Sequence, residues 1–116
     1  MTAGKERTAL GVARARFVEG LARKGKELSG ALALVAGTPG EARPRDALRR
    51  RLQALYASAQ VFRVEALASA LEEGIARIDA SAEAGSEISS EALDALAHLA
   101  ATLPALGGAP QPERAS

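Results

Sequence analysis

Cysteine and tryptophan are absent from the sequence, histidine occurs once, and aromatic residues make up 3% of the chain. Without cysteine the chain has no disulfide framework, no thiolate metal site and no cysteine nucleophile. The one histidine, His98, cannot assemble a multi-histidine metal site. The sequence also lacks a glycine-rich phosphate loop, metal-ligand spacing and a paired nucleophile and base. We therefore expect no metal ion, no cofactor and no enzymatic activity.

Long apolar runs are missing as well. No apolar segment approaches the length of a membrane-spanning helix. The N-terminus alternates charged with small residues and has no apolar core like that of a signal peptide. A cytoplasmic protein without membrane partners is the simplest interpretation.

The residues that are present favour helices. A chain of 116 residues is long enough for one domain with a single core of modest size. Hydrophobic residues make up 47% of it and are mostly alanine and leucine. With so few aromatic residues, this composition favours close-packed helices over a β-sandwich or barrel. The sequence therefore predicts an all-α protein.

The net charge of +1 conceals an uneven distribution. Residues 1–51 contain 12 Lys or Arg and 5 Asp or Glu, whereas residues 52–116 contain 3 and 9. This polarity is typical of solvated helix faces. It could also steer an acidic partner toward the basic half, or support head-to-tail contacts between copies.

The helical period becomes plain from Ala15 onward, where apolar residues recur at steps of three, four and seven. The inward positions of this predicted helix are Phe17, Leu21, Leu28, Leu32 and Val35. Gly25 and Gly30 interrupt it, either as close contacts with a neighbouring helix or as tolerated residues. Residues 1–14 form a charged lead-in or an extension of the helix, and residues 37–40 end it.

Three further predicted helices follow the same period. The second begins near Pro44, which suits a first helical turn, and its inward positions are Leu48, Leu52, Leu55, Ala59 and Phe62. The third begins near Arg63 and carries Val64, Leu67, Leu71, Ile75 and Ile78. The fourth is capped by Ser86 or Ser89, ends at Pro104, and carries Ala92, Leu96, Leu99 and Leu103.

Four helices with short connections predict an antiparallel up-and-down four-helix bundle, because short loops join neighbours that run in opposite directions. The bundle spans residues 15–104 and follows the N-terminal segment 1–14. Residues 105–116 have the proline-rich, polar composition of a disordered tail or linker.

The order and spacing of these helices resemble the histidine phosphotransfer (Hpt) domain over roughly residues 16–103. That family's central motif is His, any residue, Leu or Ile, Lys, Gly, any residue and Ala, with a Gly ten positions and a Leu or Met fourteen positions after the His. The ungapped match starts at Gln53 and places Arg63 and Leu67 at the last two positions. Two flanking segments resemble the starts of the family's first and fourth helices: Phe17–Glu19 and Ile88–Leu93.

The chemical residues of the motif are replaced. Gln53 stands in place of the phospho-accepting His, Tyr56 in place of the Lys, Ala57 in place of the first Gly and Arg63 in place of the second. An imidazole is nucleophilic near neutral pH, whereas a glutamine amide is neither basic nor nucleophilic. The resemblance therefore implies the Hpt fold in a degenerate member, and residue 53 argues against phosphoryl transfer.

A polar stripe remains on the predicted second helix. Arg49, Gln53, Tyr56 and Gln60 recur at i, i+4, i+7 and i+11, roughly 100° around the helix from the buried leucines. The resemblance implies that this face, with Arg63, binds a response-regulator receiver domain or a histidine-kinase domain of a bacterial two-component or chemotaxis-like pathway. The alternative interpretation of the arginines is a solvated basic face.

Two other functions compete with docking of a receiver domain. The first is a dimerisation or scaffolding bundle, in which alanine-rich faces of the third and fourth helices pair with a second copy. The second is nucleic-acid binding through Arg43, Arg45 and residues 49–51, which a net charge of +1 and the absence of helix-turn-helix geometry disfavour. His98, between the inward Leu96 and Leu99, is read as a boundary histidine and not as a relocated phosphoryl acceptor.

Overall fold

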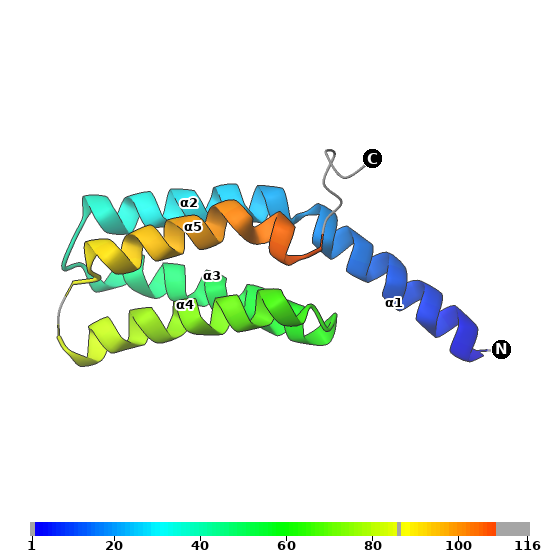
Figure 1. The fold of residues 1–116 in the computed structure, drawn as a ribbon. Helices are drawn as coiled ribbons and strands as arrows, with labels where there is room; N and C mark the ends of the chain where they lie inside the picture. The colour runs from blue at the N-terminus through cyan, green and yellow to red at the C-terminus, as the bar shows by residue number, and fades with distance from the viewer. Residues whose placement is uncertain (1, 86, 109–116) are drawn as a thin grey trace.

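The structure is a computed structural model that describes residues 2–85 and 87–108. Five helices make up this part of the chain (Figure 1) and no strand occurs in it: α1 (Thr2–Glu19), α2 (Leu21–Gly37), α3 (Ala42–Val61), α4 (Glu65–Glu83) and α5 (Ser90–Leu106). The predicted all-α class is confirmed. Of the predicted tail, residues 109–116 lie outside the described residues.

The predicted first helix is divided in two. α1 ends at Glu19 and α2 begins at Leu21, with Gly20 at the turn between them. The Gly20 N–H still donates to the carbonyls of Arg16 and Phe17 at 3.0 and 3.2 Å. The chain therefore changes direction while the backbone hydrogen bonding is nearly continuous, and α1 extends away from the other helices in Figure 1. The prediction of one continuous helix from Ala15 was wrong, because the period of the apolar residues carries no information about a change in the direction of the helix axis.

Helices α2 to α5 surround one aliphatic core. α2 packs against α3 and α5, and α4 packs against α3 and α5. Buried leucines from all four helices fill the centre: Leu21, Leu28, Leu48, Leu52, Leu67, Leu71, Leu96 and Leu103 are each at most 1% exposed. No polar or charged side chain among the described residues is buried. Hydrophobic burial is therefore the main force that holds the four helices together.

Glycines allow two helix contacts to be close. A Cβ built on Gly25 would lie 2.5 Å from the Ala100 carbonyl oxygen of α5. A Cβ on Gly74 would lie 3.1 and 3.2 Å from the side chains of Leu96 and Leu99. Gly30, by contrast, has nothing within 4 Å. Of the two glycines predicted as possible contact points on α2, Gly25 is one and Gly30 is not.

The ends of the last helices differ in part from the prediction. Ser89 caps α5, because its side-chain oxygen accepts the Ala92 N–H at 3.1 Å, while Ser86 lies outside the described residues. α5 continues through Pro104 to Leu106, so the prediction that Pro104 ends the helix was wrong. A proline in the last turn removes a single backbone donor, the one that would serve the Ala100 carbonyl, and the helix continues past it. No helix in the described part of the chain has the length and apolarity to cross a membrane.

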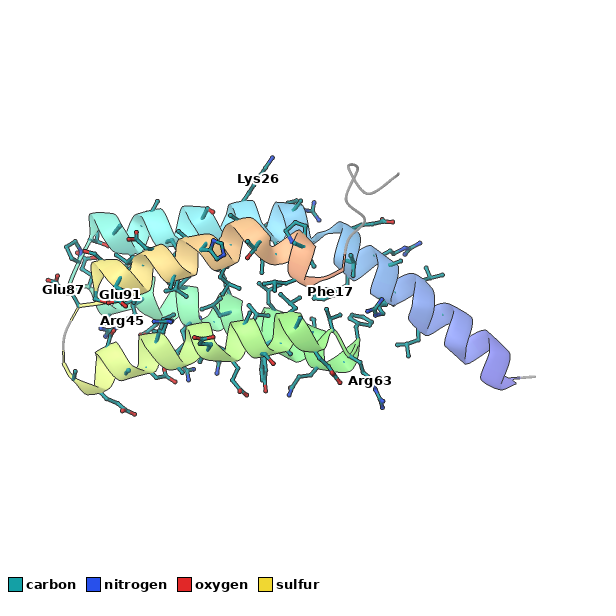
Figure 2. All side chains as sticks on the ribbon, in the orientation of Figure 1. Phe17, Lys26, Arg45, Arg63, Glu87 and Glu91 are labelled. Atoms are coloured by element: carbon teal, nitrogen blue, oxygen red, sulfur yellow. The ribbon has the colours of Figure 1, made fainter. Side chains whose placement is uncertain are left out.

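The turn between α3 and α4 contains a strained residue. Arg63 has φ of 57°, and it is the one non-glycine residue with positive φ in the described chain. Figure 2 shows its side chain projecting from this turn. The left-handed region costs a residue with a Cβ about 1–2 kcal/mol. Glycine would adopt the backbone conformation of this turn without that cost, but the sequence has arginine at this position.

We expect the Gly25→Ala substitution to lower the free energy of unfolding by about 1–3 kcal/mol, because the new methyl group meets backbone that cannot rotate away. Gly30→Ala is the matched control on the same helix. It removes a glycine from open space and should stabilise the protein by about 0.5–1 kcal/mol. Urea denaturation followed by circular dichroism measures both. Equal effects of the two substitutions would contradict the close contact between α2 and α5.

We expect Arg63→Gly to raise the free energy of unfolding by about 0.5–1 kcal/mol, because relief of the left-handed strain exceeds the added entropy of the unfolded chain. Arg63→Ala removes the same charge but keeps a Cβ, so it should give no such gain. Thermal denaturation of the three proteins separates the backbone effect from the charge effect. A gain in both variants would assign the effect to the arginine side chain.

Candidate functional site

The structure places the predicted polar stripe on α3, along the side that faces α4. Arg49 and Tyr56 are half-buried there, whereas Gln53 and Gln60 are exposed. Arg63 follows the end of α3 and is exposed. The structure thus brings four of the five predicted binding residues onto one helix face, and places the fifth in the adjoining turn.

Arg49 is held by α4 through a two-point contact. Its Nε donates to Asp79 Oδ1 at 2.5 Å and one terminal nitrogen donates to Oδ2 at 2.8 Å. Two parallel bonds from a planar guanidinium fix its orientation more strictly than a single bond would. Side-chain exposures of 34% for Arg49 and 41% for Asp79 leave the pair accessible to solvent, so its contribution to stability is small. Its main effect is to position the arginine.

Tyr56 occupies the centre of a second polar contact. Its hydroxyl donates to Glu72 Oε2 at 3.0 Å and accepts from the Gln60 side-chain amide at 2.9 Å. The amide therefore connects two predicted site residues within α3, and Glu72 connects the hydroxyl to α4. These bonds leave the tyrosine ring in one orientation at the α3–α4 boundary.

The two contacts share one register. Arg49 and Tyr56 are seven residues apart on α3, and their partners Asp79 and Glu72 are seven apart on α4 in the reverse order. Seven residues are close to two helical turns, so both pairs lie on the same edge of the helices. The reversed order means that α3 and α4 run in opposite directions.

Gln53 lies between these two contacts along α3. Its side chain is exposed and makes no hydrogen bond to any described residue. A neutral amide in this position can accept and donate hydrogen bonds to a bound partner, but it cannot act as a nucleophile. The centre of the stripe is thus open, while its two neighbours are fixed by α4.

The hydrogen bonds change the acidity of three groups. The bond to Arg49 lowers the pKa of Asp79 below its ordinary value, and the bond to Asp79 raises the pKa of the Arg49 guanidinium. The bond that Tyr56 donates to Glu72 raises the pKa of the phenol, because ionisation would place a second negative charge beside the carboxylate. At neutral pH the Asp79 carboxyl is therefore ionised, the Arg49 guanidinium is protonated and the Tyr56 phenol is neutral, as the contacts require.

Asp79 and Glu72 were not among the predicted site residues. The signal was present in the sequence, since two positions seven residues apart on the predicted second helix face two acidic positions seven apart on the third. The predicted antiparallel order would have paired them. Without that pairing, the acidic residues of the third helix are distinguished only by their part in the overall charge asymmetry.

His98 lies elsewhere, at an apolar groove between α4 and α5. This α4–α5 groove has a volume of about 280 Å³, and residues that line it include Ala70, Gly74, Ala95, Leu96, Leu99 and Thr102. Glu73 and Arg77, an ion pair at 3.3 Å, contribute to its polar edge with His98. A second groove of about 320 Å³ lies between α2 and α3, with Lys24, Glu27 and Arg51 among its lining residues.

Neither groove nor stripe has the composition of a metal centre. Within residues 2–85 and 87–108, no three His, Cys, Asp or Glu residues are grouped so that they could hold a metal ion. Comparison of the chain with protein-family models, with curated proteins and with solved structures gives no match. The interpretation of the stripe therefore depends on the geometry described above.

We expect Tyr56 to titrate above its ordinary pKa of about 10. The raised pKa means that its contact with Glu72 stabilises the folded state below about pH 10, and that this contribution is lost as pH rises through the raised value. Tyr56 is the one tyrosine in a sequence without tryptophan, so tyrosinate absorbance reports it directly. Glu72→Gln should lower the midpoint.

Glu65→Gln, at an exposed position on the same helix, is the control and should leave that midpoint unchanged. A wild-type midpoint at or below about 10, or equal midpoints for the wild type and Glu72→Gln, would contradict the hydrogen bond to Glu72.

Proposed function

We propose that this chain is a non-catalytic, Hpt-like signalling module that docks a receiver domain or a histidine-kinase domain through α3. The observation that carries the proposal is the placement of Gln53. It is exposed at the middle of α3, and Arg49 and Tyr56 on either side are held in fixed orientations by α4. In the resembling family the reactive histidine occupies this position and faces the partner.

The conformation of Arg63 supports the proposal independently. The family pattern has a glycine ten positions after the histidine, and Arg63 stands at that position in this chain. Its φ of 57° is the left-handed conformation that glycine adopts without cost. The backbone of the α3–α4 turn thus has the shape expected of the family motif although the residue has changed.

The arrangement of helices gives further support. In Figure 1 the colour gradient runs in opposite directions along successive helices from α2 to α5, as an up-and-down bundle requires. The contacts of α2 and α4 with both α3 and α5 close these helices into a ring. On this proposal α2 to α5 are the Hpt-like bundle, and α1 is an addition to it.

The proposed docking face is suited to binding without chemistry. Tyrosine and arginine are frequent anchors of protein interfaces. Side chains that are already oriented lose less conformational entropy when a partner binds. The proposed role of Arg49 and Tyr56 is to contact the partner, and the role of Gln53 is to allow close approach without accepting a phosphoryl group.

The proposal is tested by restoring the reactive residues. We expect the variant Gln53→His, Tyr56→Lys, Ala57→Gly to accept phosphate from a phosphorylated receiver domain, whereas the wild type binds the same domain and stays unlabelled. In the transfer, the imidazole Nε2 attacks the phosphorus, the bond from phosphorus to the aspartate oxygen breaks, and the carboxylate leaves. The product is an acid-labile phosphohistidine, measured with radiolabelled phosphate.

Gln60→His is the matched control, since it places an imidazole on the same stripe about two turns from the centre. It should not be labelled. The receiver domains to use are those of the response regulators encoded in the same genome. Labelling of neither variant by any of them, with wild-type helicity retained, would overturn the proposal, and so would equal labelling of the two variants.

A further inference from the structure

α1 contacts the end of α3 through two side chains. The rings of Phe17 and Phe62 lie with their centroids 5.3 Å apart, and Arg14 Nε donates to the Phe62 carbonyl at 3.2 Å. Farther toward the N-terminus, Leu10 is 53% exposed and Val12 is 48% exposed. The contact with α3 is therefore made near the C-terminal end of α1, and it centres on Phe62.

The backbone at the end of α3 forms a Schellman motif. The Val64 N–H donates to the Ala59 carbonyl at 2.9 Å, and the Arg63 N–H donates to the Gln60 carbonyl at 3.2 Å. Arg63 is the left-handed residue that this motif requires, a position that glycine usually fills. With arginine there, the hydrogen bonds of the turn must offset the cost of its positive φ.

The Phe62 carbonyl takes no part in these two bonds, and it accepts from α1 instead. A helix leaves carbonyls without partners at its C-terminal end, where the helix dipole also concentrates negative charge. The guanidinium of Arg14 is a favourable donor there, because its positive charge opposes that of the dipole. Since Phe17 packs against the ring of the same residue, α1 contacts both the main chain and the side chain of Phe62.

The turn is in contact with the α3 stripe. Gln60 accepts the Arg63 N–H through its main-chain carbonyl, and its side-chain amide donates to the Tyr56 hydroxyl at 2.9 Å. Figure 2 shows Phe17 and Arg63 at the same end of the bundle. Consecutive bonds thus join the α1 contact at Phe62, the α3–α4 turn and the stripe.

The junction between α1 and α2 allows the direction of α1 to change. It consists of Gly20, whose φ of −78° and ψ of −8° are helical. Glycine has access to more backbone conformations than any other residue, so a different angle between the two helices costs little at this position. The contacts at Phe62 therefore help to decide where α1 lies.

We infer that α1 is a positioning helix for the docking face, with Arg14 and Phe17 as its positioning residues. While α1 is in place, the α3–α4 turn keeps the conformation that orients Arg63. When α1 is drawn away, the turn loosens and the docking face binds its partner more weakly. Coupling between two sites is reciprocal, so a bound partner also holds α1 in place. The effect on docking rests on the proposed function, whereas the coupling between α1 and the turn does not.

Hydrogen exchange of the full chain, followed by NMR, tests the coupling, because the amides of Arg63 and Val64 report directly on the turn. We expect the double variant Arg14→Ala, Phe17→Leu to raise their exchange rates about tenfold relative to that of the Leu71 amide. Leu71 is fully buried in the core and reports general stability. Arg16→Ala is the matched control, since it removes the same charge from an exposed position on α1. It should leave this ratio unchanged.

A second reference amide separates a local effect from a general one. The Thr38 N–H donates to the Leu34 and Val35 carbonyls at the C-terminal end of α2, at the opposite end of the bundle from Phe62. Its exchange relative to Leu71 should be the same in the wild type and the double variant. Unchanged exchange at Arg63 and Val64, or an equal rise at these amides, Thr38 and Leu71, would overturn the coupling.

Titration calorimetry with a receiver domain that binds the wild type tests the effect on docking. The double variant should bind that domain about tenfold more weakly, and Arg16→Ala should bind it as the wild type does. Equal affinity of the wild type and the double variant would overturn the role of α1 in docking. Absence of binding by the wild type would overturn the proposed function and this role with it, while the exchange rates decide the coupling on their own.

Discussion

The aliphatic core of α2 to α5 is the constraint on which the rest of the molecule depends. Burial of leucine and isoleucine supplies attraction without direction, and no polar side chain is buried among the described residues to specify which turn of one helix meets which turn of the next. Two features beside the packing of these side chains favour one register: the close contact of Gly25 with the Ala100 carbonyl, and the polar contacts at the α3–α4 edge.

The sequence predicted most of the fold because its apolar period is regular. The inward leucines of α2 to α5 are buried as expected, and the turn after α3 falls at the predicted place. The change of direction at Gly20 and the continuation of α5 through Pro104 were not predictable from that period. Both depend on how backbone segments pack in three dimensions, and a one-dimensional pattern of apolar residues does not contain this information.

The candidate site was predictable in its location and not in its connections. The stripe on α3 follows from helical spacing alone. Its cross-helix partners Asp79 and Glu72 depend on the relative register of two helices, which the spacing of residues within one helix does not give. With these contacts in view, the stripe is a pair of oriented side chains on either side of an open amide. This arrangement supports the proposed docking role over the solvated basic face, the alternative interpretation of the arginines.

The order of the helices also separates charge across the width of the molecule. α2 and α3, which contact each other, carry eight of the 15 lysines and arginines and two acidic residues, whereas α4 and α5 on the opposite side carry seven of the 14 acidic residues and one arginine. The small net charge therefore coexists with an electric dipole moment perpendicular to the helices. The electric field of a charged surface exerts a torque on such a dipole before any contact forms. The molecule therefore rotates as it approaches the surface and collides more often in one orientation. Added salt would randomise that approach while leaving the folded shape unchanged.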